Sequence, residues 1–159
     1  MSYITAQNLN KTYGRGDAIV SAVSDVSFQI QAGEFISLMG ESGAGKSTLL
    51  SIMGAMNAPT SGTFVVDEID IYSLSSEQQA DFRREFLGFI FQDFCLVPYL
   101  TVSENVMLPL TIVKKSRKQK QQMVRSALSQ VDLLDKAARL PNQISGGEKE
   151  RVAIARAIV

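Results

Sequence analysis

Gly40-Glu41-Ser42-Gly43-Ala44-Gly45-Lys46-Ser47-Thr48 is the stretch that decides the fold of this chain. It fits the pattern G-x-x-x-x-G-K-[S/T], which is typical of a loop that cradles the phosphates of a nucleotide. Its glycines let the backbone curl, so that successive N–H groups point inward at an anion. We expect Lys46 to reach the β- and γ-phosphates and the Ser47 hydroxyl to bind Mg²⁺. The stretch therefore predicts nucleotide binding.

The segments on either side support this interpretation. Residues 34–39, Glu-Phe-Ile-Ser-Leu-Met, are short and largely apolar and are bounded by Gly33 and Gly40, which predicts a buried strand. Residues 49–53, Leu-Leu-Ser-Ile-Met, continue as a helix from about residue 46 to residue 56. A strand, a glycine-rich loop and a helix are the context that the motif needs.

Composition narrows the class of protein. The chain has 159 residues, 45% hydrophobic and 20% charged, with a formal net charge of zero. This is ordinary globular composition, and it argues against a protein that binds nucleic acid by electrostatics alone. No apolar run is long enough to span a bilayer, so we expect a soluble protein that can still sit on a membrane through a partner. The single cysteine, Cys95, excludes an internal disulfide and is expected to be buried.

Further strands are predicted around the phosphate loop. Residues 3–32 are expected to form two or three strands, with a turn at residues 10–17 and clear alternation over residues 22–30. Residues 63–67 and 88–92 each predict another short strand. Between them, Ser75 and Gln78 form a capping box for a helix through about Leu87, and Gly88 is expected to end that helix in a left-handed conformation.

The second half of the chain predicts helices. Thr101 with Glu104, Ser116 with Gln119 and Ser145 with Glu148 are predicted to cap three helices, and Pro109 is expected to end or kink the first of them. Apolar side chains then recur at helical spacing, at Val124, Ala127, Leu128, Val131 and Leu134. A basic run at residues 114–120 suggests nucleic acid or acidic lipid, but it has no interleaved aromatic residues. We interpret it as the solvated start of a helix.

The last segment identifies a family. Residues 144–148, Ile-Ser-Gly-Gly-Glu, precede residues 151–157, Arg-Val-Ala-Ile-Ala-Arg-Ala, and resemble the signature motif of ABC-type ATPases. The phosphate loop, Gln92 at a predicted strand end and this segment occur in that family's order. Residues 88–94 and 100–110 resemble the branch of lipoprotein-releasing, macrolide-exporting, antimicrobial-peptide-resistance and cell-division ATPases.

The resemblance implies an α/β fold: a P-loop NTPase core with an N-terminal antiparallel β portion and a helical subdomain. It implies three parts: a nucleotide-binding core at residues 1–93, a helical subdomain at residues 94–144, and a signature helix at residues 145–159. In the family, the signature helix faces the γ-phosphate held by the other subunit, which implies a head-to-tail dimer. The family usually has Leu and Gln where this chain has Ile144 and Glu148, and the second change adds a charge near the partner subunit.

The resemblance also implies the residues of the site. Lys46 and Gln92 are the catalytic candidates, Ser47 and Gln92 the Mg²⁺ candidates, and Tyr13 the residue that stacks on adenine. The cofactors are ATP and Mg²⁺. The remaining candidate residues bind phosphate or act across the dimer: Gly40, Glu41, Ser42, Gly43, Ala44, Gly45 and Thr48 in the loop, and Ser145, Gly146, Gly147 and Glu148 in the signature.

Partners follow from the same resemblance. We expect a homodimer, or a heterodimer with another ABC ATPase subunit, bound to integral-membrane permease subunits on the cytoplasmic face of the membrane, with no nucleic-acid partner. A nucleotide-responsive adaptor of a membrane complex, without transport, is the alternative. A soluble ABC protein acting on ribosomes or DNA is a third class, and a GTPase is disfavoured because residues 10–13, Asn-Lys-Thr-Tyr, lack the Asp of a guanine-reading motif.

The family's catalytic Glu and His have no counterpart in the sequence. The chain contains no histidine, and the apolar strand that supplies Asp and Glu is expected just after Val159. We therefore expect the 159-residue chain to bind Mg-ATP weakly without hydrolysing it, to be marginally stable, and to be a fragment of a longer reading frame.

Overall fold

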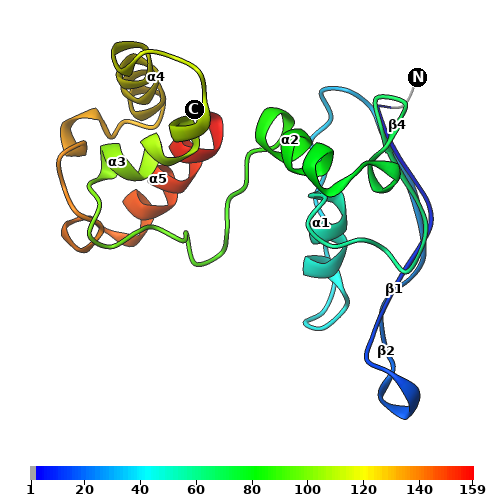
Figure 1. The fold of residues 1–159 in the computed structure, drawn as a ribbon. Coiled ribbons are helices and arrows are strands. Elements are labelled where there is room, and N and C mark those ends of the chain that lie inside the picture. Colours follow the sequence, from blue (N-terminus) through cyan, green and yellow to red (C-terminus); the bar gives the residue numbers. More distant parts are fainter. Residues whose placement is uncertain (1–2) are drawn as a thin grey trace. The chain divides into compact units, whose positions relative to one another are not determined.

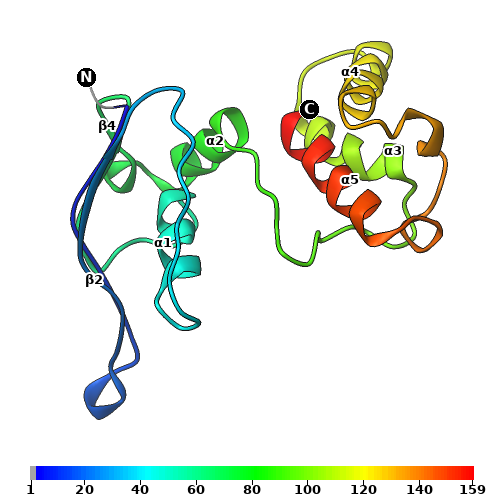
Figure 2. The same cartoon turned by 180° about the vertical axis from the view of Figure 1, so that it is seen from behind.

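The computed structural model describes residues 3–159 in two compact units, and each is treated by itself below. The first unit extends to Glu85 and contains an antiparallel sheet with helices on one side, while Phe86–Val159 form a helical unit (Figures 1 and 2). The division into residues 1–93, 94–144 and 145–159 stays a prediction. None of the helices in the described chain is long and apolar enough to cross a membrane.

The sheet of the first unit has four strands. They are β1 (Ile4–Tyr13), β2 (Val20–Ile30), β3 (Ser61–Val66) and β4 (Ile69–Asp70), in the order β2-β1-β3-β4, and each pairs with its neighbours in antiparallel fashion. The predicted antiparallel β portion is confirmed. The turn between β1 and β2 is shorter than predicted, because β1 continues to Tyr13 before a 3-10 helix at Gly16–Ala18.

Helix α1 (Lys46–Met53) covers one face of this sheet, and α2 (Ser76–Phe86) lies on the same side (Figures 1 and 2). Leu49 and Ile52 of α1 are buried against Leu9 of β1 and Phe64 of β3. Apolar surface removed from water in this way is the main stabilising contribution of the unit. The packing of α1 on the sheet therefore fixes the position of the helix start that follows the phosphate loop.

Two predicted strands do not form. Residues 34–39 carry no strand hydrogen bonding, and their apolar side chains are exposed, with Phe35 at 96% and Met39 at 85% of their full accessibility. Residues 88–92 are also outside any strand. A strand exists only when a neighbour accepts and donates its backbone hydrogen bonds, and no strand within residues 3–159 is adjacent to either segment. Apolar composition alone therefore predicted burial wrongly here.

The helical unit contains α3 (Val102–Met107), α4 (Arg117–Gln130) and α5 (Gly146–Ile158), which pack on one another. Short 3-10 helices lie at Leu108–Ile112, Leu134–Lys136 and Pro141–Gln143. All three predicted capping boxes of this unit are present, and α3 ends just before Pro109 as expected. The buried core of the unit is Val102, Val106, Leu110, Val124, Ala127, Leu128, Leu133, Ile144, Val152 and Ala155.

Three expectations for side chains in this unit are wrong. Leu134 is 40% exposed, because α4 ends at Gln130 and the helical spacing does not continue to it. Cys95 is exposed instead of buried. Gly88 does not have positive φ. A residue without a side chain is needed there for a different reason, because an added Cβ would lie 2.3 Å from the carbonyl oxygen of Ala157 in α5.

Candidate nucleotide-binding site

The side chain of Lys46 folds back onto the phosphate loop. Lys46 Nζ donates hydrogen bonds to the carbonyl oxygens of Gly40 (2.7 Å) and Glu41 (2.6 Å). Gly40, Gly43 and Gly45 have φ values of 155°, 83° and 80°, which side chains rarely adopt, so glycine is needed at each bend. Residues 40–44 and Ser47 are exposed, whereas Lys46 is half-buried, with its ammonium held by the two backbone acceptors.

The start of α1 is fixed by contact with the sheet. Gly45 is its N-cap residue, in the left-handed conformation and without a side-chain cap. A Cβ on Gly45 would lie 1.9 Å from the carbonyl oxygen of Ala22 in β2, so only glycine lets the helix begin here. The first N–H groups of a helix have no partner within it, and together with the helix dipole they favour an anion. Ser47, in this first turn, is exposed.

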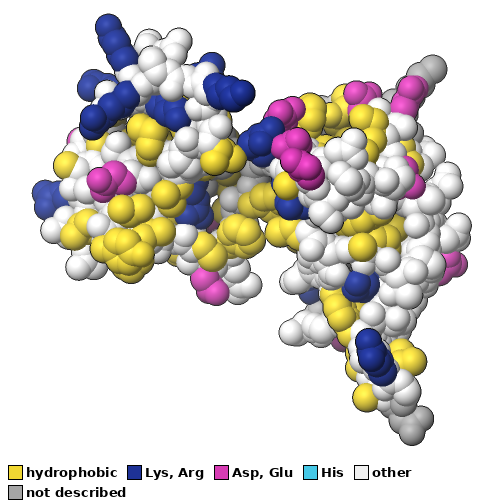
Figure 3. All heavy atoms as spheres, in the orientation of Figure 1, with side chains coloured by type: hydrophobic (Ala, Val, Ile, Leu, Met, Phe, Trp, Pro, Cys, Tyr) yellow, Lys and Arg dark blue, Asp and Glu magenta, His cyan; other side chains and the backbone are white. Residues whose placement is uncertain are grey.

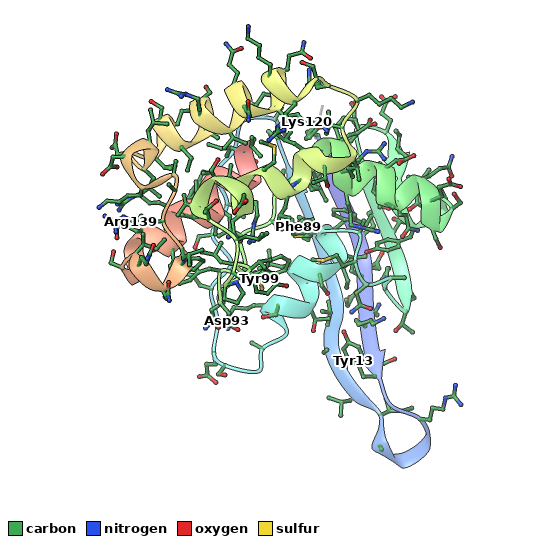
Figure 4. The ribbon with its side chains drawn as sticks, turned by 60° about the vertical axis from the view of Figure 1, so that its left-hand side comes forward. Tyr13, Phe89, Asp93, Tyr99, Lys120 and Arg139 are labelled. Atoms are coloured by element: carbon green, nitrogen blue, oxygen red, sulfur yellow. The ribbon has the colours of Figure 1, made fainter. Side chains whose placement is uncertain are left out.

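Tyr13 lies at the end of β1 in the same unit (Figure 4) and is 44% exposed. Its hydroxyl oxygen accepts a hydrogen bond from Asn57 Nδ2 at 2.5 Å, and Lys11 Nζ lies 5.2 Å from the ring centroid. Lys11 is itself held, because its Nζ also donates to the carbonyl oxygen of Ala58 at 2.6 Å. The ring is therefore fixed at the surface, as a stacking platform requires.

Gln92 lies in an exposed turn of the second unit. Phe94 N donates to the carbonyl oxygen of Phe91 at 2.9 Å, and Phe94 and Cys95 have φ values of 57° and 46°. Positive φ in non-glycine residues stores strain and needs support from the surrounding structure.

Arg156 of α5 gives that support. Its guanidinium donates to the carbonyl oxygens of Phe94 (2.5 Å) and Cys95 (2.7 Å). Sequence reasoning missed this residue and also Asn57, the partner of Tyr13. Arg156 lies 62 residues from Phe94, and no local pattern reports such a contact.

The signature segment forms a closed cap at the start of α5. Ser145 Oγ accepts from Glu148 N at 3.3 Å, and the Glu148 carboxylate accepts from Ser145 N at 2.7 Å. This hydrogen bond from the Ser145 backbone, followed by the bond from its side chain, lowers the pKa of Glu148 to about 2. Lys136 Nζ, 3.3 Å from Glu148, contributes less. Glu148 is therefore charged at neutral pH.

Two further features mark this helix start. Gly146 and Gly147 are exposed, and an added Cβ on either would meet no atom within 4 Å. Gln92, Gly146 and Lys149 line one cavity of about 500 Å³ within the second unit, so the structure brings Gln92 and the signature segment together. The phosphate loop and Tyr13 belong to the first unit.

Comparisons with known proteins show to which family the chain belongs. The family model described as ABC transporter matches residues 23–159. An uncharacterized ABC transporter ATP-binding protein of Bacillus subtilis is 44% identical over 98% of this chain and 68% of its own length. A lipoprotein-releasing system ATP-binding protein of Porphyromonas gingivalis is 42% identical over 98% of this chain and 69% of its length.

Similarity extends to a permease fusion and to solved structures. The macrolide export ATP-binding/permease protein of Salmonella typhimurium is 41% identical over 96% of this chain, which covers 24% of that protein. A solved dimeric ATP-binding cassette in a post-hydrolysis state, bound to ADP and Pi, superimposes with a TM-score of 0.88 at 40% identity, over 98% of this chain and 68% of that one. With the geometry above, these matches show that the chain belongs to the ABC transporter family, as one of its ATP-binding subunits and an ATPase by family.

Proposed function

We propose that this chain binds Mg-ATP at its phosphate loop and contributes one half of each nucleotide site in a head-to-tail dimer. The observation that carries the proposal is the position of Lys46, whose ammonium is held over a loop of positive-φ glycines at the start of α1. Backbone N–H groups, a helix dipole and a fixed ammonium form a site for the phosphates of a nucleotide. The solved dimeric cassette bound to ADP and Pi supports the same arrangement.

Each remaining residue then has a stated task. The Ser47 hydroxyl and the Gln92 amide oxygen are hard oxygen ligands that suit Mg²⁺, which lowers the charge on the phosphates when bound. Lys46 moves from its backbone acceptors to the β- and γ-phosphates. Tyr13 stacks on the adenine, and Asn57 keeps the tyrosine ring in place.

The signature segment acts on the nucleotide of a second copy. Gly146 and Gly147 leave the backbone at the start of α5 open, because no atom lies where their side chains would be. A phosphate can approach such a helix start closely. Glu148 opposes this approach, because its carboxylate places a negative charge beside Ser145 that repels the phosphate. We infer that closure of the dimer is weaker than it would be with Gln at this position.

We also propose the setting in which the dimer works. The similar macrolide export protein of Salmonella typhimurium is named as an ATP-binding/permease protein, and the lipoprotein-releasing relative as an ATP-binding protein of a system. By analogy, the chain drives permease subunits from the cytoplasmic face of a membrane. Closure on ATP would bias the permease between two conformations.

Sedimentation velocity with and without Mg-ATP tests the dimer. We expect the wild-type chain to shift from monomer to dimer with Mg-ATP and to stay monomeric with ATP and EDTA. Gly147→Glu is the decisive variant. The fold of the chain leaves space for the new side chain, whereas in the proposed dimer this side chain would collide with the nucleotide bound to the partner. It should bind ATP and remain monomeric.

Lys46→Ala is the second arm of the test, and it should weaken nucleotide binding about 10- to 100-fold and reduce dimer formation with it. Circular dichroism serves as the control that both variants are folded. Dimerisation of Gly147→Glu at wild-type ATP concentrations would contradict the proposed role of the signature segment, while ATP binding by that variant separates this failure from a failure of the phosphate loop.

A further inference from the structure

Positive charge gathers on one part of the helical unit. Between Glu104 and Asp132 the chain contains no Asp or Glu, although its net charge is zero. Six of its 16 Lys and Arg lie in this interval. Figure 3 shows Lys and Arg side chains gathered over α4. None of the six forms an ion pair with an acidic side chain in the part of the chain that the structure describes. We call five of them the α4 basic patch: Lys114, Lys115, Arg117, Lys118 and Lys120.

The patch is unfavourable for the helix that carries it. Arg117 and Lys118 open the first turn of α4, and that turn contains no acidic residue. Cations at this end oppose the helix dipole, which favours negative charge there. The cap itself uses neutral Gln119 opposite Ser116, so no carboxylate compensates. Because the charges weaken the helix, the stability of α4 does not account for them.

A groove lies beside these charges. Lys115, Arg117 and Lys120 line it with residues of α3, and its volume is about 500 Å³ (Lys120 is labelled in Figure 4). The one acidic residue in the groove, Glu104, is already engaged, since its carboxylate accepts from Thr101 N and Thr101 Oγ1, both at 2.7 Å. These bonds lower the pKa of Glu104 and hold its carboxylate within the capping box of α3.

We propose that the α4 basic patch binds the phosphate headgroups of anionic phospholipids, so that the helical unit contacts the membrane surface directly. The inference rests on the proposed function only in placing the chain beside a membrane. Charge complementarity carries the rest, and Ile112, two residues before Lys114 and 65% exposed, adds an apolar contact at the same edge. A nucleic acid fits less well, because residues 114–130 contain no aromatic side chain on which a base could stack.

Vesicle co-sedimentation of the full chain tests this. We expect binding to vesicles in which about a third of the lipid is phosphatidylglycerol and none to pure phosphatidylcholine. The triple variant Lys115→Gln, Arg117→Gln, Lys118→Gln should lower the partition coefficient about 100-fold, because each cation near an anionic surface adds to the free energy of membrane binding. A matched control removes the same charge elsewhere, through Arg15→Gln, Arg84→Gln and Arg139→Gln, and should stay within about 3-fold of wild type.

Other outcomes overturn the proposal. Equal losses in the two triple variants would show that net charge alone drives binding. Displacement by inorganic phosphate at constant ionic strength would indicate a site for the free ion, and tighter binding to an oligonucleotide than to vesicles would indicate nucleic acid. Lys46→Ala should weaken ATP binding about 10- to 100-fold and leave vesicle binding unchanged, so the two proposals fail independently.

Discussion

Helices α1 and α5 both have glycine at their start, as the N-cap Gly45 of α1 and as Gly146 and Gly147 in the first turn of α5, yet these two starts are organised in opposite ways. Gly45 starts α1 in the left-handed conformation without a side-chain cap. Ser145 starts α5 in an extended conformation and closes a full capping box with Glu148. The α1 end is thus open to an external anion, while the α5 end already holds a carboxylate of its own. A phosphate bound in one chain belongs at α1.

The two helix starts also differ in how they are held. Gly45 touches the backbone of β2, where a Cβ would lie 1.9 Å from the Ala22 carbonyl oxygen. Gly146 faces open space. Glycine is therefore a packing requirement at α1 and an accessibility feature at α5.

Substituting alanine at each start gives the largest contrast. Gly45→Ala should destabilise the first unit by about 3 kcal/mol or more, because it adds both a backbone clash and strain at a φ of 80°. Gly146→Ala should change stability by less than about 0.5 kcal/mol. Urea unfolding of both variants measures the difference, and equal losses would remove the distinction between the two glycines.

Removing the arginine that ties α5 to the Gln92 turn should have a smaller effect. Arg156→Gln loses charged donors to two carbonyl oxygens, at Phe94 and Cys95, which we expect to cost about 2 kcal/mol. Amide hydrogen exchange should accelerate in residues 92–95. Arg151→Gln, an exposed change on the same helix, is the control; if it accelerates exchange in that turn as much as Arg156→Gln does, the turn is not held by Arg156.

The capping box of α5 predicts a mild pH dependence of stability. The Glu148 pKa falls from 4.5 to about 2 on folding, so the contribution of its carboxylate to stability is complete above pH 4.5 and is lost as pH falls toward 2. The melting temperature of the wild type exceeds that of Glu148→Gln by an amount that should therefore decrease as the pH is lowered from 4.5 toward 2. A difference independent of pH would show that the charge of Glu148 does not stabilise the helix start.

The sequence predicted the local parts of the molecule well. Capping boxes at Thr101, Ser116 and Ser145 form as expected, because their hydrogen bonds join residues three positions apart. The phosphate loop is local in the same way. Its glycines adopt positive φ, and Lys46 lies over it. The roles assigned to its residues stay predictions.

Distant contacts account for what the sequence did not predict. Residues 34–39 have the composition of a buried strand, but a strand depends on neighbours that its own residues do not specify. Gly88 faces Ala157 of α5, and Arg156 reaches across a similar separation. Such pairs depend on how the helical unit packs, which no local pattern determines.

Calorimetric titration with Mg-ATP at protein concentrations that favour the monomer tests the central claim most directly, with Lys46→Ala and Lys149→Ala as a matched pair. Each variant removes one lysine from the first turns of α1 and α5. Because charged hydrogen bonds contribute about 1.5–3 kcal/mol, Lys46→Ala should lose about 10- to 100-fold in affinity, while Lys149→Ala stays within about 2-fold of wild type. Unchanged binding by Lys46→Ala, or an equal loss in both variants, would contradict a nucleotide site at the phosphate loop.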